Sequence, residues 1–353
     1  MARKQNIKFL LKQQLGQMAA FGQSKRADQE RTWSERAALR SRGEYEAAKD
    51  IDHTKNKIYS YGTMSLYTRH ADYFGRWLCE NGMKNCTMEE AHGQIQNYVD
   101  SLVERGQSAW TVHTAAASLC KVFGDKMERY ELPKRGLADI TRSRTEAKHD
   151  SFNSRHYGNL LQANEVLGLR KSELRDLRTS NFTVVKGAGS LGEAGVTLAN
   201  CSKIVMTTKG KGGRINTRTY AAPQEVAAVQ SILQGKQPGE RIFDKHQFKA
   251  DSGDLHQSRA VSFQNLYKQV VHDIETRPGA REEYVAAINA SFAASGKQQR
   301  ENLDRPYILR GEHRAYCEQR GIPTSYNRVA TLYTSIQSGH MRSDVLVSHY
   351  LAK

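Results

Sequence analysis

The chain has 353 residues, of which 38% are hydrophobic, a formal net charge of +16 at pH 7 and a pI near 9.6. This length allows two domains, and no run of about twenty apolar residues is present that would cross a membrane. The positive charge exceeds what solubility requires and favours a polyanionic partner such as nucleic acid. The five cysteines are scattered without a CxxC pair, so reduced thiols are expected rather than disulfides or a zinc site.

The first 57 residues are predicted to form a basic N-terminal arm. Residues 1–23 predict an amphipathic basic helix that packs or contacts DNA, because their larger apolar residues fall near helical spacing. Those residues are Ile7, Leu10, Leu11, Leu15 and Met18. Residues 24–57 are rich in charge and poor in large apolar side chains, which predicts a solvated, partly helical segment.

Residues 58–132 are predicted to form a compact helical domain built from three short amphipathic helices. The apolar positions are Tyr67, Ala71, Phe74 and Leu78 in the first, Ile95, Val99 and Leu102 in the second, and Val112, Ala116, Leu119 and Phe123 in the third. Thr87 and Glu90 have the spacing of a capping box before the second helix. Residues 133–150 combine proline, glycine and many charges, and predict an interdomain linker.

Residues 151–353 are predicted to form a mixed α/β domain. A helix ends at Gly168, another begins near Ser172, and the strands KIVMTT and RINTRTYA flank a glycine-rich turn that predicts a hairpin. Residues 244–304 are polar and weakly patterned, and predict helices with long loops. The only local candidates for a metal site are in DSGDLH, and a polar loop is the better interpretation of that stretch. These candidates are Asp251, Asp254 and His256.

The remaining candidates for chemistry are cations and one tyrosine close to the end of the sequence. Cleaving a phosphodiester without a metal requires a nucleophile, donors to the non-bridging oxygens and an acid for the leaving 5′-oxygen. Two arginines, a lysine, a histidine and a tyrosine would supply each of these parts.

The stretch LGLRKSELRDL, residues 167–177, resembles the first arginine box of the tyrosine recombinase, or phage integrase, family. The closing GH…Y segment is similar to the last box of that family, and the helical domain resembles its core-binding domain. The resemblance implies a mainly α fold with a small β component, in which an N-terminal helical core-binding domain precedes a mixed α/β tyrosine recombinase catalytic domain.

The resemblance makes Arg170 the first arginine that grips the phosphate, with Glu173 in support. A planar guanidinium suits two phosphate oxygens at once. The hairpin resembles the family's hairpin with a basic tip, and Lys211 is the expected catalytic lysine, with Lys209 as the alternative.

The third box of the family is His-x-x-Arg on a helix, and the expected match is ILRGEHRAYCEQRG. Arg314 is assigned as the second catalytic arginine, which puts Gly311 where the family has histidine. Arg310 is the alternative arginine, and His313 either assists or packs. The sequence separation between Arg170 and Arg314 is long compared with that in the simplest members of the family, and residues 244–304 look like an insertion.

In the last box, Gly339 and His340 match the family's glycine and histidine, and Tyr350 matches its nucleophile. His340 would donate to a non-bridging oxygen while Tyr350 attacks phosphorus. The family usually places the tyrosine nine residues after the histidine, whereas here it is ten residues after it.

The resemblance therefore implies a site-specific recombinase that cleaves and rejoins DNA strands through a 3′-phosphotyrosyl intermediate, for integration, excision or inversion of a mobile element. It implies specific sites on double-stranded DNA, a homotetramer on synapsed DNA, DNA-bending accessory proteins, no metal or cofactor, and a cytoplasmic, nucleoid-associated location in a bacterium or phage-infected cell. The alternatives are a type IB topoisomerase-like enzyme that relaxes DNA and a non-catalytic DNA-binding accessory relic.

Overall fold

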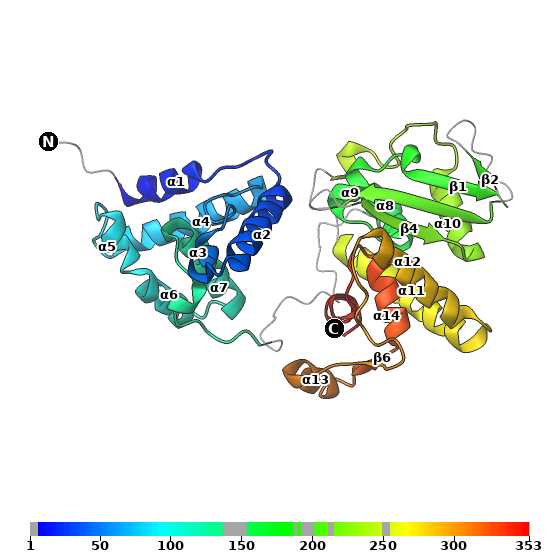
Figure 1. Ribbon diagram of the computed structural model, residues 1–353. Helices are drawn as coiled ribbons and strands as arrows, with labels where there is room; N and C mark the ends of the chain where they lie inside the picture. Colours follow the sequence, from blue (N-terminus) through cyan, green and yellow to red (C-terminus); the bar gives the residue numbers. More distant parts are fainter. Residues whose placement is uncertain are drawn as a thin grey trace. The chain divides into compact units, whose positions relative to one another are not determined.

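A computed structural model describes residues 6–136, 154–186, 189–191, 201–210, 215–248 and 255–352. The chain divides into two compact units, Met1–Thr141 and Arg142–Lys353. The fold is mainly α-helical with a small antiparallel sheet in the second unit, as predicted (Figure 1). Within the described ranges, no helix is both long and apolar enough to span a bilayer.

The secondary-structure elements described in the first unit are all helices. These are α1 (Ile7–Gln17), α2 (Lys25–Ser41), α3 (Tyr45–Asp50), α4 (Tyr61–Glu80), α5 (Met88–His92), α6 (Ile95–Glu104), α7 (Ala109–Phe123) and the 3₁₀ turn η1 (Met127–Arg129). The three predicted amphipathic helices correspond to α4, α6 and α7. The predicted capping box is present at α5, where Thr87 and Glu90 cap each other's backbone N–H groups.

The N-terminal helix is part of the core of this unit rather than a separate arm. Ile7, Leu11 and Leu15 are fully buried in the same cluster as Phe74 on α4. Glycine at position 75 permits this approach, because a Cβ there would lie 2.8 Å from Cγ of Lys8. Of the two roles that the sequence left open for this helix, packing or DNA contact, the structure shows the packing.

Residues 24–57 are tied to the unit by a partly buried acid. Asp28 on α2 accepts hydrogen bonds from Nζ of Lys57 at 2.8 Å and from the hydroxyl of Tyr59 at 2.7 Å. The Lys57 ammonium and then the Tyr59 hydroxyl lower the pKa of Asp28. Ile58 is buried in the main cluster, so the predicted boundary between residues 57 and 58 falls inside this unit.

The second unit contains helices around a four-stranded sheet. Its helices are α8 (Ser154–Leu167), α9 (Lys171–Asp176), α10 (Pro223–Leu233), α11 (Leu255–Thr276), α12 (Ala280–Ala294), α13 (Gly311–Glu318), α14 (Arg328–Gln337) and α15 (Ser343–Leu346). Its strands are β1 (Phe182–Lys186), β2 (Gly189–Leu191), β3 (Lys203–Lys209), β4 (Ile215–Tyr220), β5 (Tyr307–Ile308) and β6 (Ser325–Tyr326). Short turns η3 (Thr179–Asn181) and η5 (Lys245–Phe248) and the π-helical η6 (Val347–Leu351) complete the unit.

The sheet has the antiparallel order β2-β1-β3-β4. The predicted hairpin is confirmed, because β3 pairs with β4 from Ile204 opposite Tyr220 to Lys209 opposite Ile215. Lys211, at the predicted basic tip, lies outside the described residues. A separate two-stranded sheet joins β5 to β6.

Helix α11 runs through the region that the sequence analysis interpreted as an insertion with long loops. The prediction of helices there is correct, but α11 is 22 residues long and packs against α8, α14 and η6. Its buried face includes Ser258, Arg259 and Ser262 as well as apolar residues. The start of this region is therefore central to the second unit and not a peripheral addition.

Candidate catalytic cluster

The turn between α8 and α9 positions Arg170. Gly168 ends α8 with a φ of +65°, a conformation that side-chain-bearing residues rarely adopt. A Cβ at Gly168 would also lie 2.5 Å from Nη1 of Arg218, so glycine is required on two grounds. Oδ1 of Asn164 accepts a 2.8 Å hydrogen bond from the backbone N–H of Leu169 and fixes the turn. Arg170 then stands in extended conformation at the N-cap of α9, as predicted from the local sequence.

Glu173 is the buried acid that links two arginines. Its carboxylate accepts hydrogen bonds from the backbone N–H of Arg170 at 2.8 Å and from Nη1 of Arg170 at 2.9 Å. The same carboxylate lies 3.7 Å from Nη1 of Arg259 on α11. The Glu173 side chain is only 2% exposed, and a carboxylate is buried to this degree only when it is paired.

Arg259 lies at the centre of the cluster and is 2% exposed. Its Nε donates to the hydroxyl of Tyr350 at 3.1 Å, and its Nη2 donates to the carbonyl of Ser338 at 2.8 Å. Its Nη1 donates to the carbonyl of Gly168. Burial lowers the pKa of Arg259 from its ordinary value. Each terminal nitrogen has two N–H groups, so each has one donor beyond these bonds for a further acceptor.

Tyr350 is buried beside Arg259, with 4% of its surface exposed. Its ring meets the ring of Phe263 edge-on, with 5.4 Å between centroids. Nε2 of Gln264 donates to the Tyr350 carbonyl at 2.7 Å, so α11 holds both the backbone and the hydroxyl of this residue.

His340 completes the side of the cluster next to Arg170. Gly339 has a φ of +84° and lies against the side chain of Asn216, and His340 follows it directly. The backbone N–H of His340 donates to the carbonyl of Ser335 at 2.9 Å. Nε2 of His340 then lies 3.4 Å from Nη2 of Arg170.

His256 is a further residue at the cluster, and the sequence analysis did not assign it a role in phosphate chemistry. It precedes Arg259 by three residues on α11, which puts both side chains on one face of the helix. Its ring centroid lies 6.0 Å from that of Tyr350.

The end of β3 lies close to Glu173 of the cluster. Gly210 follows β3, and a Cβ there would lie 3.2 Å from Oε1 of Glu173. Lys209 is exposed beside this glycine and pairs with Ile215 across the hairpin. The hairpin therefore brings the segment that contains Lys209 next to Glu173, while Lys211 lies outside the described residues.

The structure places the predicted third-box residues away from this cluster. Arg314 lies on α13, where its side chain is 52% exposed and its Nε pairs with Glu318 at 2.7 Å. Arg310 is the exposed N-cap residue of the same helix. Nε2 of His313 lies 3.4 Å from the carbonyl of Ala352. The assignment of Arg314 is corrected here: α13 buries Cys317 and turns Arg314 to the surface, whereas Arg259 occupies the position beside Tyr350.

The signal that identifies Arg259 was present in the sequence. His256-Gln257-Ser258-Arg259 is a literal His-x-x-Arg pattern, and Ala260, Ser262 and Phe263 supply the small and aromatic residues that follow it in the family. It was missed because DSGDLH was interpreted as a polar loop and the helix after it has little apolar periodicity.

The extra residue between His340 and Tyr350 is accommodated by η6. After the regular turn of α15, residues Val347–Leu351 form a π-helix, and the N–H of Ala352 donates to the carbonyl of Val347 at 2.8 Å. This bond spans five residues instead of four, so the turn contains one more residue than an α-helical turn. Tyr350 lies within that turn.

The net charge of the cluster favours binding of a group with a single negative charge. Arg170 and Arg259 carry two positive charges against one negative charge on Glu173, which leaves one positive charge among these three side chains. Guanidinium groups and an imidazole N–H are effective donors to phosphate oxygens, and a neighbouring phenol is a nucleophile once it is deprotonated. The arrangement can therefore hold a phosphodiester and attack it.

No protein-family model matches the chain, and no curated protein matches it. Among solved structures, the chain is similar to a XerH site-specific recombinase bound to a palindromic difH substrate in a post-cleavage complex, with 13% identity over 83% of this chain and 88% of that one and a TM-score of 0.39. It is also similar to a XerA recombinase, with 13% identity over 68% of this chain and 94% of that one and a TM-score of 0.19. Likenesses this weak carry no functional assignment, which depends instead on the geometry of the cluster.

Proposed function

We propose that this protein is a tyrosine site-specific recombinase that cleaves one DNA strand at a time and keeps the bond energy in a 3′-phosphotyrosyl ester. Tyr350 attacks the scissile phosphorus, and the 5′-oxygen leaves. A 5′-hydroxyl from a partner duplex then attacks the ester and reseals the strand. The substrate is double-stranded DNA at specific sites, for integration, excision or inversion of a mobile element.

The observation that carries this proposal is the hydrogen bond from Nε of the buried Arg259 to the hydroxyl of the buried Tyr350, in a cluster with the partly exposed Arg170 and His340. Four side chains from separate parts of the sequence meet there, and each has a function that phosphoryl transfer requires. The two arginines neutralise the non-bridging oxygens, and His340 donates to one of them.

Two groups remain for proton transfer. His256 lies beside the Tyr350 ring and is the proposed acceptor of the phenolic proton. A lysine of the hairpin, Lys211 or its neighbour Lys209, is proposed to protonate the leaving 5′-oxygen, because the hairpin approaches Glu173 at Gly210.

A type IB topoisomerase-like enzyme is the second candidate, because relaxation of supercoils would use the same side chains. The non-catalytic accessory relic was considered because ILRGEHRAYCEQRG matches the third box poorly. His256 and Arg259 match His-x-x-Arg directly, which supports the catalytic proposal over this alternative. Relaxation of plain supercoiled plasmid without site preference would favour the topoisomerase.

The test is a suicide DNA substrate with a nick near the scissile phosphate, taken from repeated sequences beside the gene. The wild-type protein should form a covalent adduct that survives denaturing electrophoresis, and Tyr350→Phe should form none because its ring has no nucleophilic oxygen. Tyr316→Phe is the matched control and should form the adduct at the wild-type rate, since it removes only a hydroxyl and keeps the ring of Tyr316 on α13 that packs against the neighbouring hydrophobic cluster. An adduct that persists in Tyr350→Phe would refute the proposed nucleophile.

A further inference from the structure

The segment between α12 and α14 builds a small module next to the end of the described chain. Strand β5 pairs with β6, with Tyr307 opposite Tyr326, and together they enclose α13. The N–H of Leu309 donates to the carbonyl of Thr324 at 2.9 Å and closes the module. Figure 1 shows α13 and β6 at the edge of the second unit, away from the four-stranded sheet. Residues 299–326 are called the clasp below, and residues 343–352 the tail.

The clasp and the tail share one hydrophobic core. Leu309, Cys317 and Tyr326 of the clasp are at most 6% exposed and pack with Val347 and Ala352 of the tail, which are at most 4% exposed. Tyr350 lies between these two tail residues in the sequence. The clasp thus buries the chain on both sides of the proposed nucleophile.

A hydrogen-bond network holds the other end of the tail. Glu301 accepts from the backbone N–H of Ser343 at 2.9 Å and from its hydroxyl at 2.6 Å, at the first residue of α15. At the far end, Nε2 of His313 lies within 3.4 Å of the Ala352 carbonyl. The clasp therefore contacts the tail at its first residue and at its last described residue.

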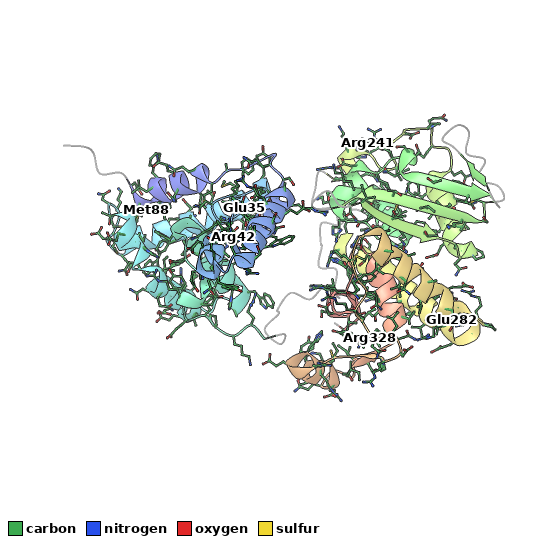
Figure 2. The ribbon with its side chains drawn as sticks, in the orientation of Figure 1. Glu35, Arg42, Met88, Arg241, Glu282 and Arg328 are labelled. Atoms are coloured by element: carbon green, nitrogen blue, oxygen red, sulfur yellow. The ribbon has the colours of Figure 1, made fainter. Side chains whose placement is uncertain are left out.

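The clasp is itself anchored to the rest of the second unit. The guanidinium of Arg328, labelled in Figure 2, donates to the carbonyls of Arg305 at 3.0 Å and Pro306 at 2.9 Å, and lies 3.5 Å from Glu301. The ring of Tyr267 on α11 meets the ring of Tyr326 edge-on, with 6.2 Å between centroids. Helices α11 and α14 therefore contact the clasp, and the clasp contacts the tail. Tyr350 of the tail in turn contacts α11.

We propose that the clasp is a positioning device that holds the tail in its own domain, so that Tyr350 acts beside Arg259 of the same chain. Glu301, Leu309 and His313 are the positioning residues, and none of them needs to touch DNA. This inference depends on the proposed function for its effect on cleavage. Its effect on the tail itself does not depend on that function.

The first test changes the shared core from each side. Leu309→Asp and Ala352→Asp put a carboxylate into a dry cluster, which should release the tail. Displacing a nucleophile by an ångström slows attack strongly, so single-turnover cleavage should fall about tenfold or more while the Kd for site DNA stays within about twofold. Ala352→Ser should retain wild-type cleavage, as should Arg314→Ala on the exposed face of α13. Wild-type cleavage by both aspartate variants would overturn the proposal.

The second test asks which chain supplies the tyrosine. Tyr350→Phe and Arg259→Lys proteins are mixed on site DNA, so that every assembly contains chains with only one intact group each. If the clasp holds the tail in its own domain, the mixture should form no more adduct than either variant forms alone. Adduct at a substantial fraction of the wild-type yield would show that the tail reaches a neighbouring chain and would overturn the proposal.

The third test needs no DNA. Hydrogen exchange of the Ala352 amide should be slow in the wild-type protein and at least about tenfold faster in Leu309→Asp and in the milder His313→Ala, because both loosen the clasp. The buried thiol of Cys317 should become reactive to maleimide in the same variants. A tail that exchanges rapidly in the wild-type protein would refute the clasp. Absence of any adduct together with a slowly exchanging tail would refute only the proposed function.

Discussion

Arg259 is bound on three sides by acceptors from three different parts of the chain. Gly168 ends α8, Ser338 follows α14, and Tyr350 lies in the π-helical turn. A guanidinium can reach all three at once because its donors spread in a plane, whereas an ammonium is a single point charge on a flexible stem. The geometry of this residue therefore matters as much as its charge.

Arg259→Lys and Arg314→Lys make the same chemical change at a buried and at an exposed arginine. We expect Arg259→Lys to lower the cleavage rate about 100-fold, since a precisely placed donor to the developing charge is lost. Arg314→Lys should cleave within about twofold of the wild type, because its surface pair with Glu318 is worth little. Single-turnover cleavage with DNA affinity measured in parallel checks both. The reverse order of effects would restore the predicted assignment of Arg314.

At the scale of elements, the π-helical turn explains how a tyrosine ten residues after His340 still lies beside Arg259. Deleting Ser348 removes one residue from that turn and should convert it to an α-helical turn with Ala352 in place. Deleting Asp344 from α15 should instead rotate Tyr350 by about 100° about the helix axis. We expect adduct formation to persist in the Ser348 deletion and to disappear in the Asp344 deletion. Loss in both deletions, with the fold intact by circular dichroism, would contradict this account of the turn.

The N-terminal helix supplies a second element-scale prediction. Leu11→Ala should lower the free energy of unfolding by about 2–5 kcal/mol, because the leucine is fully buried in the core with α4. Phe9→Ala on the same helix is the control and should change it by less than about 1 kcal/mol, since Phe9 is 53% exposed. Thermal or urea unfolding measures both. Equal small effects would mean that α1 is peripheral to the core of the first unit.

How far the sequence could predict the site depends on how local each contact is. Arg170 and Glu173 are three residues apart across a helix start, so glycine, arginine and the acid indicate their geometry directly. Arg259 meets partners 79 and 91 residues away in the sequence, and no short pattern encodes such contacts. The face of α11 toward the cluster uses Ser258, Arg259 and Ser262, so a functional requirement for polar groups hides the periodicity that predicts a buried helix.

At the scale of the whole molecule, the net charge of +16 predicts how the proposed binding to DNA depends on salt. Binding that neutralises several phosphates releases counterions, so raising the salt from about 50 to about 200 mM should weaken binding about a thousandfold or more. Tyr350→Phe should show the same salt slope, because the lost hydroxyl carries no charge. Titrations by fluorescence anisotropy measure both slopes. A flat salt dependence would argue against a phosphate-dominated interface.

The bonds from Arg259 to two distant carbonyls also determine which inactive variant of this protein could map the proposed DNA sites in cells. Replacing Arg259 by alanine would leave the Gly168 and Ser338 carbonyls without their donor and Glu173 without a nearby cation, at a cost of about 3–5 kcal/mol, which rivals the stability of many domains. Such a variant should be less stable, so a loss of DNA occupancy could come from unfolding. Tyr350→Phe removes only the hydroxyl oxygen and keeps Arg259 with its carbonyl and carboxylate partners. It is therefore the better inactive variant for mapping the proposed DNA sites.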